Sequence, residues 1–256
     1  MLNKLSFRQA LNYEVSRLSP KSAICGRQIL KMLHTLAFVA ISIFGLSAQK
    51  TTAETYRGSF ESGRVERQYV VNIPDSTPDG RRLPTIIVLH GPLMNGASMR
   101  RLFDMDDIGE REGFAVVYPD SYGRMWNDGR NPAEQAPNDV RFLNQLAKRL
   151  IDDGIADPNR LYLIGLSSGG MLSYRVACET PRTFAAYAAV VANMPKELSK
   201  RCKPNLGVPM LIINSRHEKE IPETSDQAEW MQGRVLSPSA TVEFWRKNNG
   251  CSNTSL

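Results

Sequence analysis

A strand-like segment that runs through a Gly-Ser turn into a helix-like segment constrains this chain more than any other feature. The apolar run 160–164 stops at Gly165, Ser167 stands between glycines, and residues 171–178 have the composition of a helix. The pattern G-x-S-x-G in this setting is typical of a sharp strand-to-helix junction, which needs small neighbours because it strains the serine backbone. Such a turn lifts the Ser167 hydroxyl to the tip of a sheet and aims the N–H of Ser168 at an oxyanion formed there. The alternative is an ordinary Gly/Ser turn after a strand.

The rest of the chain alternates between apolar runs and helical patterns. A length of 256 residues allows one sizeable domain with a well-buried core. Alternating strands and helices indicate an α/β protein with a mostly parallel, doubly wound sheet, in which ligands bind at the carboxyl ends of the strands. The segment 120–137, rich in Gly, Pro and Asn, predicts a long loop of the kind that often carries function. The predicted strands are 69–73, 84–91, 114–119, 160–165, 187–191 and 209–214, and the predicted helices are 103–112 closed by Gly113, 139–152 capped by Asn138, 171–178 and 239–248.

The net charge of +6 comes almost entirely from the start of the chain. Residues 1–48 carry six Lys or Arg and one acidic residue, which leaves 26 basic and 25 acidic residues in the remainder. The charge therefore gives no argument for nucleic-acid binding, and we expect no nucleic-acid partner.

The same region has the pattern of an export signal. The apolar run 36–44 follows Arg27 and Lys31 and precedes several small residues. We therefore expect a leader over residues 1–53, a folded domain over residues 54–256, and a secreted product, extracellular or periplasmic. The run is shorter than the ~20 residues that a spanning helix prefers, so we expect no stable membrane association. A membrane anchor and a buried core helix are the alternatives.

Three of the four cysteines lie in the expected domain, and Cys25 lies in the leader. Export permits disulfides, and Cys178 and Cys202 can pair, which leaves Cys251 as a free thiol. Three unrelated buried thiols are the alternative, since free cysteines are commonly buried. No C-x-x-C or His/Cys cluster indicates a metal site.

Several motifs in one order carry a family resemblance. They are Leu89-His90-Gly91, Gly113 to Pro119, Trp126-Asn127-Asp128-Gly129-Arg130, Gly165 to Met171 and Asn249-Gly250-Cys251. Over roughly residues 56–251 the chain resembles the secreted polyhydroxybutyrate depolymerase and feruloyl esterase-like group of α/β-hydrolases. The resemblance implies an α/β-hydrolase fold and a serine esterase with Ser167 as nucleophile, acting on a small-molecule or polymeric ester without metal or organic cofactor.

The resemblance also implies a position for the triad acid. The family pattern G-T-x-D-x-x-V-P corresponds to residues 215–222, and the register set by Pro222 places Glu218 at the acid position. A glutamate can orient an imidazolium as an aspartate does, although it is one methylene longer. The alternative is that Glu218 is a solvated loop carboxylate. His217, its neighbour, is interpreted as an exposed loop histidine.

The base and the oxyanion hole depart from the family pattern. The family's histidine lies beyond the N-G-C motif, but no histidine follows His217 in this sequence. His90 is interpreted as a structural residue beside the oxyanion hole, with a role as substitute base as the alternative. The second oxyanion donor would come from residue 92, which is a proline without an N–H, so Leu93 is the expected donor if the loop is shifted.

The W-N-D-G-R block has two interpretations. Trp126, Asp128 and Arg130 are expected to frame the substrate pocket for the acyl or alcohol group. The alternative is loop stabilisation, with an ion pair between Asp128 and Arg130 and with Trp126 covering the core; loop positions often serve both purposes.

These observations together predict a secreted serine carboxylic-ester hydrolase whose C-terminal part is missing. Because the triad histidine is absent, we expect the chain to have little activity. The competing hypotheses are a non-catalytic relative that binds esters or polymer, favoured by Pro92 and the absent histidine, and a truncated gene product.

Overall fold

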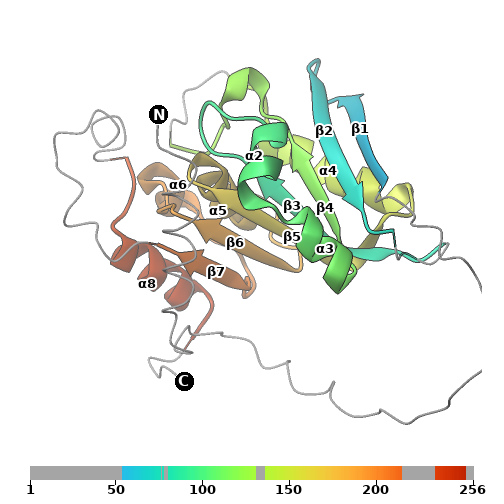
Figure 1. Ribbon diagram of the computed structural model, residues 1–256. Coiled ribbons are helices and arrows are strands. Elements are labelled where there is room, and N and C mark those ends of the chain that lie inside the picture. The colour runs from blue at the N-terminus through green and yellow to red at the C-terminus, as the bar shows by residue number, and fades with distance from the viewer. Residues whose placement is uncertain (1–53, 76, 78–79, 131–135, 215–233, 252–256) are drawn as a thin grey trace, which may run out of the picture.

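The structure is a computed structural model that describes residues 54–75, 77, 80–130, 136–214 and 234–251. The expected leader, His217 and Glu218 lie outside these residues. Figure 1 shows a central twisted sheet with helices on both of its faces. The fold class predicted from the sequence, a mostly parallel α/β-hydrolase sheet, is confirmed by this architecture.

The sheet of the described residues has seven strands in the order β1-β2-β4-β3-β5-β6-β7. The pairs β1–β2 and β2–β4 are antiparallel, whereas β3 pairs in parallel with β4 and β5, and β5–β6 and β6–β7 are also parallel. The elbow serine therefore follows a strand with parallel neighbours on both sides. The strands are β1 Glu54–Glu61, β2 Glu66–Ile73, β3 Leu83–Leu89, β4 Ala115–Pro119, β5 Ala156–Leu166, β6 Ala186–Val190 and β7 Met210–Ile213.

The sheet divides the core into two layers, and helices cover each layer. Neighbouring residues of one strand enter opposite layers, because side chains alternate across a sheet: Val70 packs with Met99 of α2, and Val71 packs in the cluster that contains Phe142 of α4 and Leu172 of α5. In α8, Trp245 stacks on Tyr174 of α5 at 5.8 Å between ring centroids. The helices are α2 Gly96–Phe103, α3 Asp106–Glu112, α4 Asp139–Asp152, α5 Ser168–Glu179, α6 Lys196–Arg201 and α8 Pro238–Asn248, with a 3₁₀ turn η1 over Tyr122–Arg124.

The element predictions need correction. The predicted helix 103–112 begins only at Asp106, because Asp104 takes a left-handed conformation with φ 53° and its N–H closes a separate helix, α2, on the carbonyl of Arg100. Helix α2 over Gly96–Phe103 was not predicted. Strand β1 was not predicted, although it pairs with β2 along all eight residues. The predicted helix ends were right at two places: Gly113 closes α3 at φ 72°, and the Asn138 side chain accepts the N–H of Arg141 at the start of α4.

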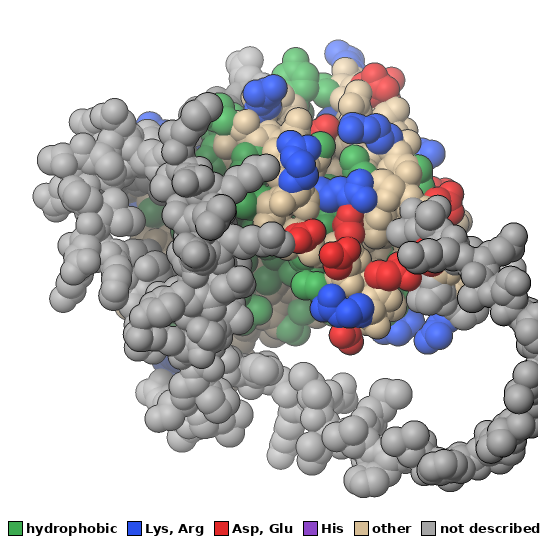
Figure 2. All heavy atoms as spheres, in the orientation of Figure 1, with side chains coloured by type: hydrophobic (Ala, Val, Ile, Leu, Met, Phe, Trp, Pro, Cys, Tyr) green, Lys and Arg blue, Asp and Glu red, His purple; other side chains and the backbone are tan. Residues whose placement is uncertain are grey.

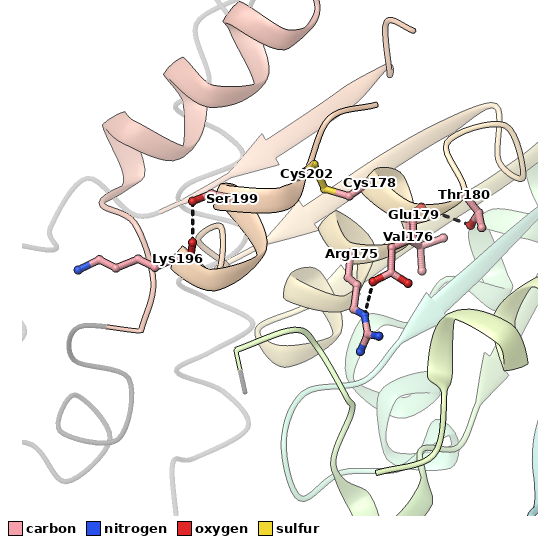
Figure 3. Close-up of a disulfide and its surroundings, with 8 residues drawn as sticks. All are labelled: Arg175, Val176, Cys178, Glu179, Thr180, Lys196, Ser199 and Cys202. Atoms are coloured by element: carbon pink, nitrogen blue, oxygen red, sulfur yellow. Dashed lines mark hydrogen bonds and ion pairs between the residues drawn. A yellow bond between two sulfur atoms is a disulfide. The ribbon is translucent and has the colours of Figure 1, made fainter. Parts of the chain in front are cut away.

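The predicted disulfide between Cys178 and Cys202 is confirmed. It joins the end of α5 to the residue after α6, with a Cα–Cα distance of 5.1 Å, and Figure 3 shows it beside the Arg175–Glu179 ion pair of α5. The prediction that Cys251 is a free thiol is wrong, because Cys251 is also disulfide-bonded. The partner of Cys251 lies outside the described residues.

The described surface over α2 and α3 carries both signs of charge. Figure 2 shows basic and acidic side chains interspersed on this face. None of the helices in the described ranges is long and apolar enough to cross a membrane.

Candidate active site

Ser167 occupies a strained turn between β5 and α5. Its backbone has φ 53° and ψ −115°, a conformation that non-glycine residues adopt rarely and that is held here by its surroundings. The N–H of Ser167 donates to the carbonyl of Val190 on β6, and its carbonyl accepts the N–H of Met171 in α5, both at 2.9 Å. The turn is therefore fixed to the neighbouring strand on one side and to the following helix on the other.

The glycines around Ser167 are required by close packing. A Cβ on Gly165 would lie 2.1 Å from the carbonyl oxygen of Gly169, and a Cβ on Gly169 would lie 2.7 Å from the carbonyl oxygen of His90. A Cβ on Gly170 would lie 2.6 Å from the Ala192 methyl group. The pattern G-L-S-S-G-G thus lets β5, α5 and the turn after β3 approach one another more closely than side chains would allow.

The first N–H of helix α5 belongs to Ser168, which is fully buried. The first N–H groups of a helix have no acceptor within the helix, and they lie at the positive end of its dipole. This N–H follows the Ser167 hydroxyl directly in the chain, and its role as an oxyanion donor stays a prediction.

The second expected donor, Leu93, is engaged elsewhere. Its N–H donates to the carbonyl of Arg124 at 2.9 Å, its backbone is left-handed at φ 60°, and its side chain is 74% exposed. The next N–H, of Met94, donates to the carbonyl of Gly91 at 3.4 Å. Leu93 can serve as an oxyanion donor only if its bond to Arg124 opens, so this role stays a prediction.

His90 is buried with both ring nitrogens occupied. The N–H of Ser121 donates to Nε2 at 3.1 Å, and Nδ1 lies 2.7 Å from the carbonyl oxygen of Gly91. A backbone N–H can only donate and a carbonyl can only accept, so the neutral tautomer with a proton on Nδ1 satisfies both. Burial lowers the pKa of His90, against the raising effects of the Gly91 carbonyl and of Asp120. These contacts favour the structural interpretation of His90 over the base.

The W-N-D-G-R block is a tightly bonded loop. Trp126 donates its indole N–H to the carbonyl of His90 at 2.9 Å, and Asp128 and Arg130 form a buried ion pair at 2.7 Å. In α5, Arg175 holds Asn127 through its carbonyl at 2.8 Å and through its side-chain oxygen at 2.5 Å. These contacts favour loop stabilisation, and the substrate-pocket role of the block stays a prediction.

A cavity of about 300 Å³ adjoins this loop. It offers aromatic and apolar surface from Tyr122, Met125 and Trp126 close to the turn that follows β3. Its lining residues are Tyr122, Met125, Trp126, Asn127, Ala136, Pro137 and Asp139.

The sequence analysis missed a buried ion pair between Arg67 and Asp139. The two side chains are 1% and 3% exposed and lie 2.7 Å apart. Burial raises the pKa of Asp139, and the Arg67 guanidinium and the N–H of Asn127 oppose that shift. The one available signal was an arginine two residues before the predicted strand 69–73.

The acid and base of a triad are not found among the described residues. Glu218 and His217 follow β7 in a segment outside them, so the acid role of Glu218 stays a prediction. Within the ranges that the structure describes, no group of three or more His, Cys, Asp or Glu side chains could hold a metal ion.

Known proteins with similar sequences are esterases and depolymerases. A sequence model of the prolyl oligopeptidase family matches residues 109–200, which include the elbow. The chain is 25% identical over 196 residues to feruloyl esterase B of Piromyces equi, covering 73% of this chain and 36% of the relative. It is 27% identical over 219 residues to poly(3-hydroxyalkanoate) depolymerase C of Paucimonas lemoignei, and the match covers 82% of this chain and 50% of the relative. The chain thus spans half or less of the length of these relatives.

A solved structure supports the fold. A thermostable esterase superposes with a TM-score of 0.53 at 19% identity, covering 77% of this chain and 51% of the other. The resemblance drawn from the sequence motifs is confirmed. The chain is similar to feruloyl esterases and polyhydroxybutyrate depolymerases, and its fold is that of the α/β-hydrolases.

Proposed function

We propose that this chain carries the nucleophile of a serine carboxylic-ester hydrolase of the feruloyl esterase and polyhydroxybutyrate depolymerase type. The observation that carries the proposal is the strained backbone of Ser167 between β5 and α5, held by glycines that allow no Cβ. A small-molecule or polymeric ester is the substrate class, in keeping with the names of the relatives.

In the proposed mechanism, Ser167 attacks the ester carbonyl and forms a tetrahedral oxyanion. The N–H of Ser168 stabilises that oxyanion, and a second donor becomes available if the bond between Leu93 and Arg124 opens. A histidine oriented by Glu218 would remove the serine proton and pass it to the leaving alcohol, and water would then attack the acyl-serine to release the acid and restore the serine. This chemistry needs no metal or organic cofactor.

The turnover of the 256-residue chain depends on which residue acts as the general base. His90 is a poor candidate, because both of its ring nitrogens are occupied, and no histidine follows His217. Because the triad members act as a unit, we expect slow turnover by the 256-residue chain.

A non-catalytic relative that binds esters or polymer is the second candidate. It is supported by Pro92, which has no N–H, and by the engaged N–H of Leu93, because removing one oxyanion donor costs about 10²–10³ in rate. We further propose export of the folded domain to the periplasm or outside the cell, on the basis of the apolar run 36–44 and its basic flank.

The test compares the purified chain with a Ser167→Ala variant on short p-nitrophenyl esters and on a methyl ferulate substrate. The proposal expects slow hydrolysis and labelling by a fluorophosphonate probe, both lost in the variant. Fusing a histidine-bearing C-terminal segment from a relative should raise turnover by about 10²–10⁴, the usual contribution of a general base. Equal turnover in wild type and Ser167→Ala contradicts the nucleophile. Saturable ester binding without any labelling favours the binding protein.

A further inference from the structure

We propose that Arg67 and Asp139 are positioning residues for the active site: their buried ion pair fixes the loop 120–127, and that loop holds the turn after β3 beside Ser167. The inference rests on the proposed esterase function for its kinetic consequence, but its structural part stands on contacts alone.

The ion pair holds both ends of the loop. Arg67, buried near the start of β2, donates through Nη2 to a carboxylate oxygen of Asp139 at 2.7 Å and to the carbonyl of Asp120 at 3.2 Å. The other carboxylate oxygen of Asp139 accepts the N–H of Asn127 at 2.7 Å. Asp120 follows β4 directly and Asn127 lies further along the same loop, so one charge pair holds this segment at two points.

The loop in turn holds the turn that follows β3. The N–H of Ser121 donates to Nε2 of His90, and the indole N–H of Trp126 donates to the His90 carbonyl at 2.9 Å. The carbonyl of Arg124 accepts the N–H of Leu93. Three hydrogen bonds from one loop therefore fix the segment from which the second oxyanion donor would come.

That segment packs directly on the elbow. The carbonyl oxygen of His90 would lie 2.7 Å from a Cβ on Gly169, in the first turn of α5. A displacement of the loop is therefore transmitted to the backbone beside Ser168, because neither side of this contact has a flexible side chain to absorb it.

The composition of the pair argues against a purely stabilising role. Arg67 is 1% exposed, its guanidinium lies 3.8 Å from the centroid of the Phe142 ring, and its Nε and Nη1 have no hydrogen-bond partner within the described part of the chain. Apolar residues of similar volume often replace a buried ion pair without loss of stability. An arginine with part of its donors unmet is thus better explained by the geometry that it imposes on Asp120 and Asp139.

The experiment measures kinetics and local hydrogen exchange in Arg67→Met and Arg67→Lys, with Asp139→Asn as a second variant that removes the charge but keeps an oxygen for Asn127. The matched control is Arg160→Met, which removes an ion pair with Asp157 at the start of β5. We expect a fall in kcat of about 10- to 100-fold with KM within about twofold, since a misplacement of ~1 Å costs up to about 10² in rate. We also expect faster exchange of the 90–93 and 120–127 amides, with partial recovery in Arg67→Lys and no change in the control.

Each outcome decides the proposal. The positioning role is overturned if Arg67→Met and the control lose kcat and thermal stability equally. It is also overturned if a folded variant exchanges the amides of residues 90–93 at the wild-type rate. If Arg67→Met does not fold, Asp139→Asn supplies the same comparison. If wild type has no turnover and no fluorophosphonate labelling at Ser167, the esterase proposal fails, and the exchange of residues 90–93 alone decides the positioning role.

Discussion

Replacing Gly165 with alanine tests the packing of the elbow most directly. The added Cβ would lie 2.1 Å from the carbonyl oxygen and 2.2 Å from the carbonyl carbon of Gly169. Cβ atoms essentially never come closer than 3.0 Å to such atoms, so the Gly169 carbonyl would have to move by about 0.9 Å, from 2.1 to 3.0 Å. No side-chain rotation can relieve the contact, because both partners are backbone.

The expected effect follows from that displacement. Overpacking of a well-packed interior costs about 1–3 kcal/mol. For a domain of this size each kcal/mol lowers the melting temperature by roughly 2–4 °C, so we expect a decrease of about 2–12 °C for Gly165→Ala. A shift of ~1 Å beside Ser168 should also slow fluorophosphonate labelling of Ser167 by about 10²-fold.

Differential scanning fluorimetry and the labelling rate measure the two effects, and Gly207→Ala is the matched control. A Cβ on Gly207 would meet nothing within 4 Å, and its backbone is not left-handed, so that variant should melt within a few degrees of wild type. If Gly165→Ala melts with the control and labels Ser167 at the wild-type rate, the argument that the elbow depends on backbone contact at this glycine is wrong.

Three further predictions concern pH, disulfides and export. Burial lowers the pKa of His90 in the folded protein, so the neutral imidazole contributes its full stabilisation above the unfolded pKa of about 6.5. This contribution is lost as the pH falls from there towards the folded pKa. The free energy of urea unfolding should therefore differ less between about pH 7 and about pH 5 in His90→Asn than in wild type. In denatured, unreduced protein Cys178 and Cys202 should resist alkylation, and reduction of their link, which spans 24 positions, should cost about 3 kcal/mol in unfolding free energy; alkylation of either residue before reduction contradicts this. N-terminal sequencing of exported protein should begin within residues 48–54, whereas retention of residues 36–44 in a membrane fraction supports an anchor.

Local signals predicted most of the fold. The continuous apolar runs of β3, β4 and β6 are buried strands, and the Asn138 and Gly113 signals set helix ends, because each depends on neighbours a few residues away. The predicted helix 103–112 starts three residues too early, because the left-handed Asp104 separates Phe103, the last residue of α2, from α3. The helical pattern alone does not mark that break, although aspartate is one of the few non-glycine residues enriched in this conformation. Strand β1 was missed because its residues are exposed or half-buried and its pairing with β2 is a tertiary property.

In the candidate site, too, the features set by nearby residues could be predicted, and those set by distant residues could not. The elbow could be predicted, because the glycines that it needs lie within five residues of Ser167. The engagement of the Leu93 N–H could not, because its acceptor is 31 positions away on the loop after β4, and the pairing of Arg67 with Asp139 spans 72 residues. Such contacts leave no periodicity in the sequence, and only the assembled sheet brings them together.

The W-N-D-G-R block shows why an exposed-looking loop motif misleads when it is interpreted from the sequence alone. A tryptophan and two charged residues in a Gly-rich loop resemble a binding surface. In the structure, however, Trp126 is 3% exposed, and Asp128 and Arg130 form a buried ion pair with each other. The loop is nevertheless bound to the site through its polar atoms: the indole N–H holds the His90 carbonyl, and Asn127 holds Asp139 and Arg175. Substitutions in this block should therefore change kcat through the turn after β3 before they change substrate affinity. Trp126→Phe removes the indole N–H together with part of a buried ring, and it should lower kcat while leaving KM within about twofold; a change confined to KM would restore the pocket interpretation.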